Sequence, residues 1–131
     1  MEKLIAREKG FRKLLVWQRA HNLVLLTYGF TEEFPKREMF GLSSQLQRAA
    51  VSIPANIEEG YAAGGNSQFG RYLRIAQGSL AEVEYYLILA RDLCYLPEAS
   101  YIKAESLRSE VGYLLHRLLK SLERSKLRET D

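Results

Sequence analysis

The stretch that decides the fold is VSIPANIEEGYAAGG, residues 51–65, in which a proline interrupts a helical pattern. Apolar side chains recur on both sides of Pro54 at steps of three and four residues, from Leu42 to Ile57 and beyond. A helix brings such positions onto one face. The stripe keeps its phase across the proline, although proline inside a helix removes a hydrogen bond and clashes with the carbonyl four residues earlier. We therefore predict a single kinked helix over residues 43–64.

Helical periodicity runs through the rest of the chain, and no strand-like alternation competes with it. It predicts three further helices, over residues 14–34, 67–95 and 98–126. Four helices with short connections favour an all-α, antiparallel up-down four-helix bundle that forms one domain over residues 1–131. The alternative at Pro54 is a new helix that starts there with Ser52 nearby as its cap.

Local signals indicate where these helices begin and which residues enter the core. Ser44 and Gln47 have the spacing of a capping box at the start of the second helix. Asn66 and Ser67 are candidate N-caps of the third. Cys94 falls on the apolar face of that third helix, so we expect a small core residue there. A single cysteine forms no internal disulfide, which fits a reducing compartment.

Composition and charge bound the function. The chain has 131 residues, of which 47% are hydrophobic and 27% charged, as is typical of a globular domain. No apolar run reaches the roughly 20 residues of a membrane span, and the charged start does not resemble an export signal, so we expect a cytoplasmic protein that does not bind membranes. Residues 1–19 and residues 117–128 each carry a local charge of +4 within a net charge of +3. Basic ends favour a polyanionic partner, and ordinary solubility is the alternative.

Three segments carry a family resemblance: FRKLLVWQRAH (residues 11–21), EMFGLSSQLQRAAVSIPANIEEG (residues 38–60) and FGRYLRIAQGSLAEVEYYL (residues 69–87). In order and spacing they resemble the 23S rRNA-intervening sequence protein family, also called the S23 family. The resemblance covers about residues 11–96. It implies a four-helix bundle that assembles as a ring-like homopentamer, without enzymatic activity and without a cofactor.

The resemblance also implies partners. Some members of the family are encoded in insertions within large-subunit rRNA genes. A related branch is the accessory variability determinant of diversity-generating retroelements, which works with a reverse transcriptase and its RNA. Nucleic acid and a reverse transcriptase are therefore the partners that the resemblance implies, and the sequence does not distinguish the two branches.

Basic side chains near the end of the chain are candidates for nucleic-acid contact. A stripe with steps of three and four residues lies opposite the leucines of the last helix: Arg117, Lys120, Arg124 and Arg128. Further basic residues would widen it: Arg12, Lys13, Arg19, Arg71 and Arg74. Repeated around a ring, the stripe would form a positive band for phosphates. No aromatic residues interleave with it, so we expect backbone contacts without sequence preference, to RNA or DNA. The alternative is an ordinary solvated face.

A second surface is expected between protomers. Apolar residues of the third helix lie away from its main stripe, and a glycine on the same side would let another backbone approach: Ile75, Gly78, Tyr85, Tyr86 and Leu89. Self-association is the simplest way to bury these additional apolar residues. Polar residues of the second helix form a stripe that we assign to contacts between protomers: Arg48, Ser52, Asn56 and Glu59.

Little in the sequence favours an enzyme or a metal site. His21 and His116 lie on different predicted helices without metal-ligand spacing. The segment GYAAGG, residues 60–65, lacks the lysine and the preceding strand of a phosphate loop. We therefore predict a non-enzymatic oligomer that binds nucleic acid non-specifically, as an accessory to a reverse transcriptase or other RNA-handling machinery. The alternative is an oligomeric scaffold or adaptor that does not bind nucleic acid.

Overall fold

The chain is helical over the part that the computed structural model describes, which is residue 10 and residues 14–130, with side chains as far as residue 125. The long helices are α2 (Leu15–Thr31), α3 (Leu42–Ala63), α4 (Asn66–Asp92) and α5 (Glu98–Thr130), and a short 3-10 helix, η2 (Lys36–Glu38), precedes α3. No strand occurs among the described residues. The prediction of an all-α fold with four long helices is confirmed.

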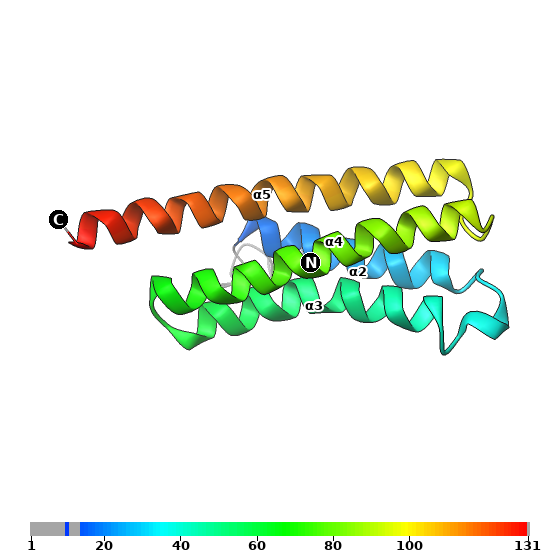
Figure 1. Ribbon diagram of the computed structural model, residues 1–131, viewed down its shortest axis with the longest axis horizontal. Helices are drawn as coiled ribbons and strands as arrows, with labels where there is room; N and C mark the ends of the chain where they lie inside the picture. Colours follow the sequence, from blue (N-terminus) through cyan, green and yellow to red (C-terminus); the bar gives the residue numbers. More distant parts are fainter. Residues whose placement is uncertain (1–9, 11–13, 131) are drawn as a thin grey trace, which may run out of the picture.

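Each long helix packs against two others, and together they enclose one core (Figure 1). α3 contacts α2 and α4, and α5 contacts the same two helices. In Figure 1 the chain turns back at each connection. The core includes Leu23, Ile53, Leu87 and Leu115, one fully buried side chain from each helix. In proteins most of the stability of a helix comes from packing of its apolar face, so burial of these stripes contributes more than local propensity does.

α3 runs without a break through Pro54, as the phase of its apolar stripe predicts. Ala50, Ile53 and Ile57 on that stripe are fully buried. Pro54 is buried as well, and it has no N–H to donate to the carbonyl oxygen of Ala50. Burial of large apolar side chains on both sides, at about 1.5–3 kcal/mol each, offsets this loss. The bend expected at Pro54 stays a prediction.

The start of α3 is capped by Glu38 and not by the expected capping box. α3 already begins at Leu42, so Ser44 and Gln47 lie inside it. The backbone N–H of Leu42 donates to Glu38 Oε1 over 3.2 Å, and Tyr95 Oη donates to Glu38 Oε2 over 2.9 Å. These two hydrogen bonds, the first more than the second, hold the pKa of Glu38 below its ordinary value. Glu38, in the turn before α3, therefore caps this helix in place of Ser44.

The connection between α3 and α4 consists of two glycines, Gly64 and Gly65. Their φ angles are 78° and 79° with ψ angles of 143°, a backbone conformation that is essentially restricted to glycine. Gly65 is the N-cap of α4, so the expectation of a cap at Asn66 or Ser67 is wrong. Asn66 is the first residue of α4, and its side-chain amide donates to Ser125 Oγ on α5 over 3.1 Å.

Cys94 is exposed, so the expectation of a core cysteine is wrong. α4 ends at Asp92, and Cys94 follows in the turn with φ of 63°. The backbone N–H groups of Tyr95 and Leu96 both donate to the carbonyl oxygen of Ala90. Such bonds around a left-handed residue are typical of a helix C-terminus. The apolar periodicity of the sequence continues past Asp92, where α4 ends. It therefore predicted a buried helical position for Cys94, which lies in the turn instead.

α2 also ends earlier than the predicted limit at residue 34. Its last residue is Thr31, and the N–H groups of Glu33 and Phe34 donate to carbonyl oxygens three residues earlier, as in a turn. Pro35 follows, and a proline disfavours helical geometry in the residue before it. Phe34 is nevertheless buried in the core, which explains its place in the apolar pattern. At the other end of the chain, α5 continues beyond residue 126.

Candidate nucleic-acid interface

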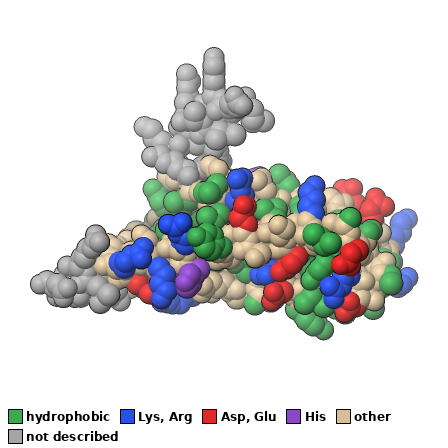
Figure 2. Space-filling model, turned by 90° about the horizontal axis from the view of Figure 1, so that it is seen from above, with side chains coloured by type: hydrophobic (Ala, Val, Ile, Leu, Met, Phe, Trp, Pro, Cys, Tyr) green, Lys and Arg blue, Asp and Glu red, His purple; other side chains and the backbone are tan. Residues whose placement is uncertain are grey.

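Basic side chains from α4 and α5 form one surface near the start of α4. We call it the basic surface, and its members are Arg71, Arg74, Arg117, Lys120 and Arg124, all of them exposed. The three residues from α5 lie on one side of that helix because they are three and four residues apart. Figure 2 shows Lys and Arg side chains gathered beside a histidine toward the carboxyl-terminal end of the molecule. Five of the predicted contact residues are thus exposed on these two helices, and two of them, Arg74 and Lys120, meet at Glu123.

Glu123 connects the two helices within the basic surface. Its Oε1 atom lies 3.3 Å from Arg74 Nη2, and its Oε2 atom lies 3.6 Å from Lys120 Nζ. All three side chains are 47% to 57% exposed, and exposed ion pairs contribute only about 0–1 kcal/mol. These two ion pairs therefore contribute little to stability. Five cations and this one carboxylate leave the basic surface with a net charge of +4.

A hollow of about 350 Å³ opens within the basic surface, between α4 and α5. Leu119 and Leu122 from α5 give it an apolar wall, and Arg71 and Arg74 from α4 line it as well. Gly70 lines it too, and no atom lies within 4 Å of the position that a Cβ would take there. Both cations that line the hollow come from α4, and Glu123 on α5 lines it as well.

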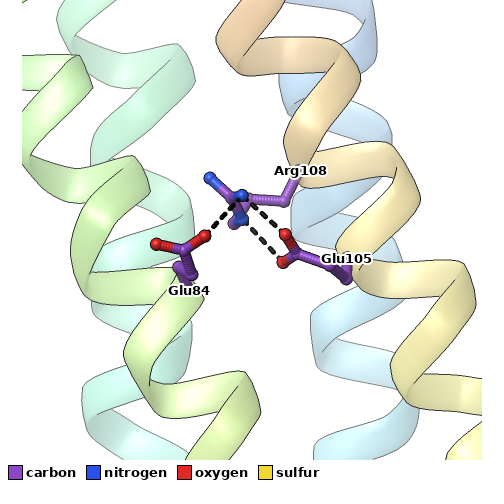
Figure 3. A network of polar contacts seen from close by, with 3 residues as sticks. All are labelled: Glu84, Glu105 and Arg108. Carbon is purple, nitrogen blue, oxygen red and sulfur yellow. Dashed lines mark hydrogen bonds and ion pairs between the residues drawn. The ribbon is translucent and has the colours of Figure 1, made fainter.

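Farther along the same pair of helices the charges cancel (Figure 3). Arg108 Nη2 on α5 donates to Glu84 Oε2 on α4 over 2.9 Å, and the same guanidinium makes two hydrogen bonds to Glu105. The bonds to Glu105 raise the pKa of Arg108 above its ordinary value. With two carboxylates around one guanidinium, this cluster has a net charge of −1. It therefore repels a polyanion and limits the basic surface to one end of the α4–α5 pair.

Other basic residues predicted for this interface are not part of the basic surface as the structure describes it. Arg19 on α2 lies with its Nε atom 2.9 Å from Glu110 Oε1 on α5. Arg12 and Lys13 lie outside the described residues, and so does the side chain of Arg128. A contribution of these three to nucleic-acid binding stays a prediction.

The sequence interpretation missed two residues of this region. Glu123 follows Lys120 by three residues and Tyr113 precedes Arg117 by four, so each is a direct neighbour on the helix surface. Tyr113 is 61% exposed, and Arg117 Cζ lies 5.9 Å from the centroid of its ring. No aromatic residue interleaves with the stripe between Arg117 and Arg124, but Tyr113 lies one helical turn before it. Sequence spacing alone would have been enough to find both neighbours.

The predicted oligomer surface on α4 is only partly exposed. Ile75 and Tyr85 are 47% and 59% exposed, and Gly78 between them is exposed too. Tyr86 and Leu89 were expected on the same face, but they are half-buried and pack against the core. Each of them is next in sequence to a buried residue of α4: Tyr86 precedes Leu87, and Leu89 precedes Ala90. The outward apolar surface of α4 is thus narrower than the sequence suggested.

The polar stripe of α3 makes contacts within the chain. Asn56 Nδ2 donates to the carbonyl oxygen of Ser52 over 2.7 Å and to its Oγ over 3.0 Å. Ser79 Oγ on α4 donates to the same Ser52 Oγ over 2.8 Å. Arg48 and Glu59, at the two ends of the stripe, are exposed. Ser52 and Asn56 therefore help α3 to pack on α4, and a role between protomers stays a prediction for the stripe.

Neither a metal site nor a membrane segment was found in the part of the chain that the structure describes. No three side chains of His, Cys, Asp or Glu there are grouped to hold a metal ion. His21 stacks on Trp17 with the ring centroids 5.3 Å apart, and His116 is exposed on α5. None of the described helices is long and apolar enough to cross a membrane.

Comparison with known proteins identifies the family. A crystal structure of a protein of unknown function from the S23 ribosomal protein family of Bacteroides thetaiotaomicron VPI-5482 has a similar fold, with a TM-score of 0.75 at 25% sequence identity. The similarity covers 81% of this chain and 99% of that one. No curated protein matches the sequence. Residues 12–117 match the family model of the 23S rRNA-intervening sequence protein. The chain therefore belongs to the 23S rRNA-intervening sequence protein family.

Proposed function

We propose that this protein is a non-enzymatic helical bundle that binds nucleic acid through the basic surface without sequence preference. The observation that supports this most strongly is that Arg74 on α4 and Lys120 on α5 meet at Glu123, with Arg71, Arg117 and Arg124 exposed on the same two helices. Among the residues whose side chains the structure describes, Glu123 is the one carboxylate in contact with these cations. Exposed cations clustered on one face are the electrostatic footprint of a nucleic-acid-binding protein.

Release of counterions would drive this binding. Each neutralised phosphate contributes about −0.7 for a single strand, or −0.9 for a duplex, to the slope of log affinity against log salt. The basic surface, with a net charge of +4, would then give a slope of about −3 to −4 for each chain. Contacts with phosphates carry no sequence information by themselves, so one chain would bind weakly and without base preference. An assembly of several chains would bind more tightly, because their contacts act together.

A salt titration with neutralised variants tests the proposal. The double variant Arg117→Gln with Arg124→Gln removes two cations from the basic surface and keeps long polar side chains. The matched control, Lys36→Gln with Lys103→Gln, removes the same charge from exposed positions outside it. Affinity is measured by fluorescence anisotropy of a labelled oligonucleotide. We expect the first variant to weaken binding and to make the slope shallower by about 1.5, and the control to bind like the wild type.

Two results would contradict the proposal. Equal loss of affinity in both double variants would mean that general charge, and not the basic surface, determines binding. Absence of wild-type binding at low salt would favour the alternative, an adaptor that recruits another protein.

Self-association is a second part of the proposed function. It is supported by Ile75 and Tyr85, which expose about half of their surface or more on one side of α4, with Gly78 between them. The family resemblance implies a pentamer. Light scattering measures the mass directly, and we expect Tyr85→Glu to reduce it, because a charge in a dry contact is unfavourable. The control Tyr28→Glu on α2 should keep the wild-type mass; a monomeric wild type at micromolar concentration would contradict this part. Association with a reverse transcriptase stays a prediction from the resemblance.

A further inference from the structure

We propose that the basic surface receives single-stranded nucleic acid, with an unpaired base stacked on the ring of Tyr113 and the phosphates held by Arg117, Lys120 and Arg124. This inference rests on the proposed function and adds the class of ligand. Its chemistry is the same for RNA and DNA, because both present bases with two flat faces and a phosphate backbone.

The four side chains follow one line along α5. Arg117 lies four residues after Tyr113, and the next two cations follow at steps of three and four residues. With a rise of 1.5 Å per residue, the line from Tyr113 to Arg124 is about 16 Å long. Phosphates along one strand of a duplex are about 3.4 Å apart in projection, so this length accommodates several consecutive nucleotides. One strand can therefore contact the ring and the cations at the same time.

The ring of Tyr113 is accessible to a base. It is 61% exposed, and Arg117 Cζ lies 5.9 Å from its centroid. That distance is at the outer limit of about 6 Å for a cation–π contact, so the guanidinium is not packed tightly over the ring. A guanidinium is itself planar and stacks on aromatic faces. Tyr113 and Arg117 thus present two flat groups next to one another on the surface.

The electrostatic surroundings set Tyr113 apart from another well-exposed tyrosine. Tyr85 on α4 is 59% exposed, but Glu82 and Glu84 lie three residues and one residue before it. A phosphate backbone would be repelled there. The acid nearest to Tyr113 in the sequence is Glu110, and its Oε1 atom lies 2.9 Å from Arg19 Nε. A strand stacked on Tyr113 would therefore lie beside cations on one side and a neutralised carboxylate on the other.

Stacking on Tyr113 would favour single strands over duplexes. In a duplex the base faces are already covered by neighbouring bases, whereas the phosphates are accessible in both forms. The cations alone would therefore bind either form, and only the ring would distinguish them. Stacking of one base on an aromatic side chain is worth about 5-fold to 140-fold in affinity, the equivalent of about 1–3 kcal/mol.

The test compares single-stranded and duplex probes of equal length. Labelled oligo-dT and oligo-U of about 20 nucleotides, and a DNA duplex of the same length, are titrated at low salt with the full chain. The variants are Tyr113→Ala, Tyr113→Phe and the control Tyr28→Ala, which removes a 43% exposed tyrosine from α2. Circular dichroism confirms that each variant is folded.

We expect Tyr113→Ala to bind both single strands at least about 5-fold more weakly and the duplex within about 2-fold of wild type, with an unchanged salt slope. Tyr113→Phe and Tyr28→Ala should bind like wild type, because stacking uses the ring and not the hydroxyl. Equal effects of Tyr113→Ala on single strands and duplex, or no effect, would overturn this inference. The proposed function would survive that result as long as the Arg117→Gln, Arg124→Gln variant still weakened binding. If the wild type bound none of the probes, both would fail.

Discussion

The helix pair α3–α4 and the helix pair α4–α5 are held together in opposite ways. Between α3 and α4 small residues allow a close approach at two places: Gly60 is buried, and Ser79 bonds Ser52 over 2.8 Å. A Cβ added to Gly60 would lie 2.7 Å from Tyr72 Cβ, closer than such atoms normally approach. The two backbones therefore lie near each other, and the contact has little freedom.

Between α4 and α5, long charged side chains make the polar contacts outside the core. Arg108 reaches Glu84 on the other helix, and Arg74 reaches Glu123. A Cβ added to Gly70, in the hollow between these helices, would meet no atom within 4 Å. The difference shows how one bundle combines a rigid contact with an open one: the first fixes the geometry of α4, and the second leaves surface on which a ligand can bind. Four predictions test this contrast.

The largest effect is expected at Gly60. Gly60→Ala should destabilise the fold by about 1–3 kcal/mol, because the new methyl group collides with Tyr72 and overpacked cores lose stability to that extent. The better helix propensity of alanine, worth up to about 1 kcal/mol, would offset part of this loss. Urea denaturation followed by circular dichroism measures the change. A variant as stable as wild type would show that α3 and α4 are less closely packed than described.

Arg108→Ala should have the next largest effect, a loss of about 1–2 kcal/mol. Its side chain is only 14% exposed and bonds two carboxylates, so its removal leaves Glu84 and Glu105 next to each other without a cation. Arg74→Ala on the same pair of helices is the control, because Arg74 is 57% exposed and its pair with Glu123 is worth about 0–1 kcal/mol. Equal losses measured by denaturation would contradict the distinction between the two ion pairs.

Gly70→Ala should stabilise the protein by up to about 1 kcal/mol. Both Gly70 and Gly60 lie inside helices, but only Gly70 has room for a methyl group, so that the gain in helix propensity is not offset by a collision. Thermal denaturation of Gly70→Ala and Gly60→Ala in parallel gives a direct comparison. Melting temperatures that shift in the same direction would refute the contrast between the two helix pairs.

The smallest effect is expected at Glu38, whose carboxylate bonds the first residue of α3 and Tyr95, which follows α4. The pKa of Glu38 is lowered in the folded protein, so its ionised form contributes stability above the ordinary carboxylate pKa of about 4.3. This contribution is lost as the pH falls through the lowered pKa, because the protonated carboxyl accepts less well from Leu42 and Tyr95. NMR titration should show the Leu42 amide shifting together with Glu38, at a pH lower than that of an ordinary glutamate. In Glu38→Gln that shift should disappear; its persistence would assign it to another group.

The sequence was sufficient for features that depend on one helix and insufficient for those that depend on two. The phase of the stripe around Pro54 predicted the continuous α3, and the spacing of Arg117, Lys120 and Arg124 predicted their common face. The approach of Arg74 to that face depends on the register between α4 and α5, which no periodic pattern specifies.

The roles of several residues in turns and close contacts were also not predicted from the sequence. Glu38 caps α3 because the turn at η2 brings its carboxylate back to Leu42, and Cys94 takes a left-handed position usually occupied by glycine. Gly60 looked like part of a helix end, and only its distance from Tyr72 shows that packing requires a glycine. Side-chain identity alone did not reveal these three roles.

The two-glycine connection has a consequence for the order in which the chain folds. Because Gly64 and Gly65 alone separate α3 from α4, the partners Ser52 and Ser79 are only 27 residues apart in sequence. The entropy lost in closing a loop grows with its length, and contacts between near neighbours form fastest. The α3–α4 hairpin should therefore form early, before α2 and α5 dock on it. The basic surface, which needs α5 beside α4, would then be complete only late in folding.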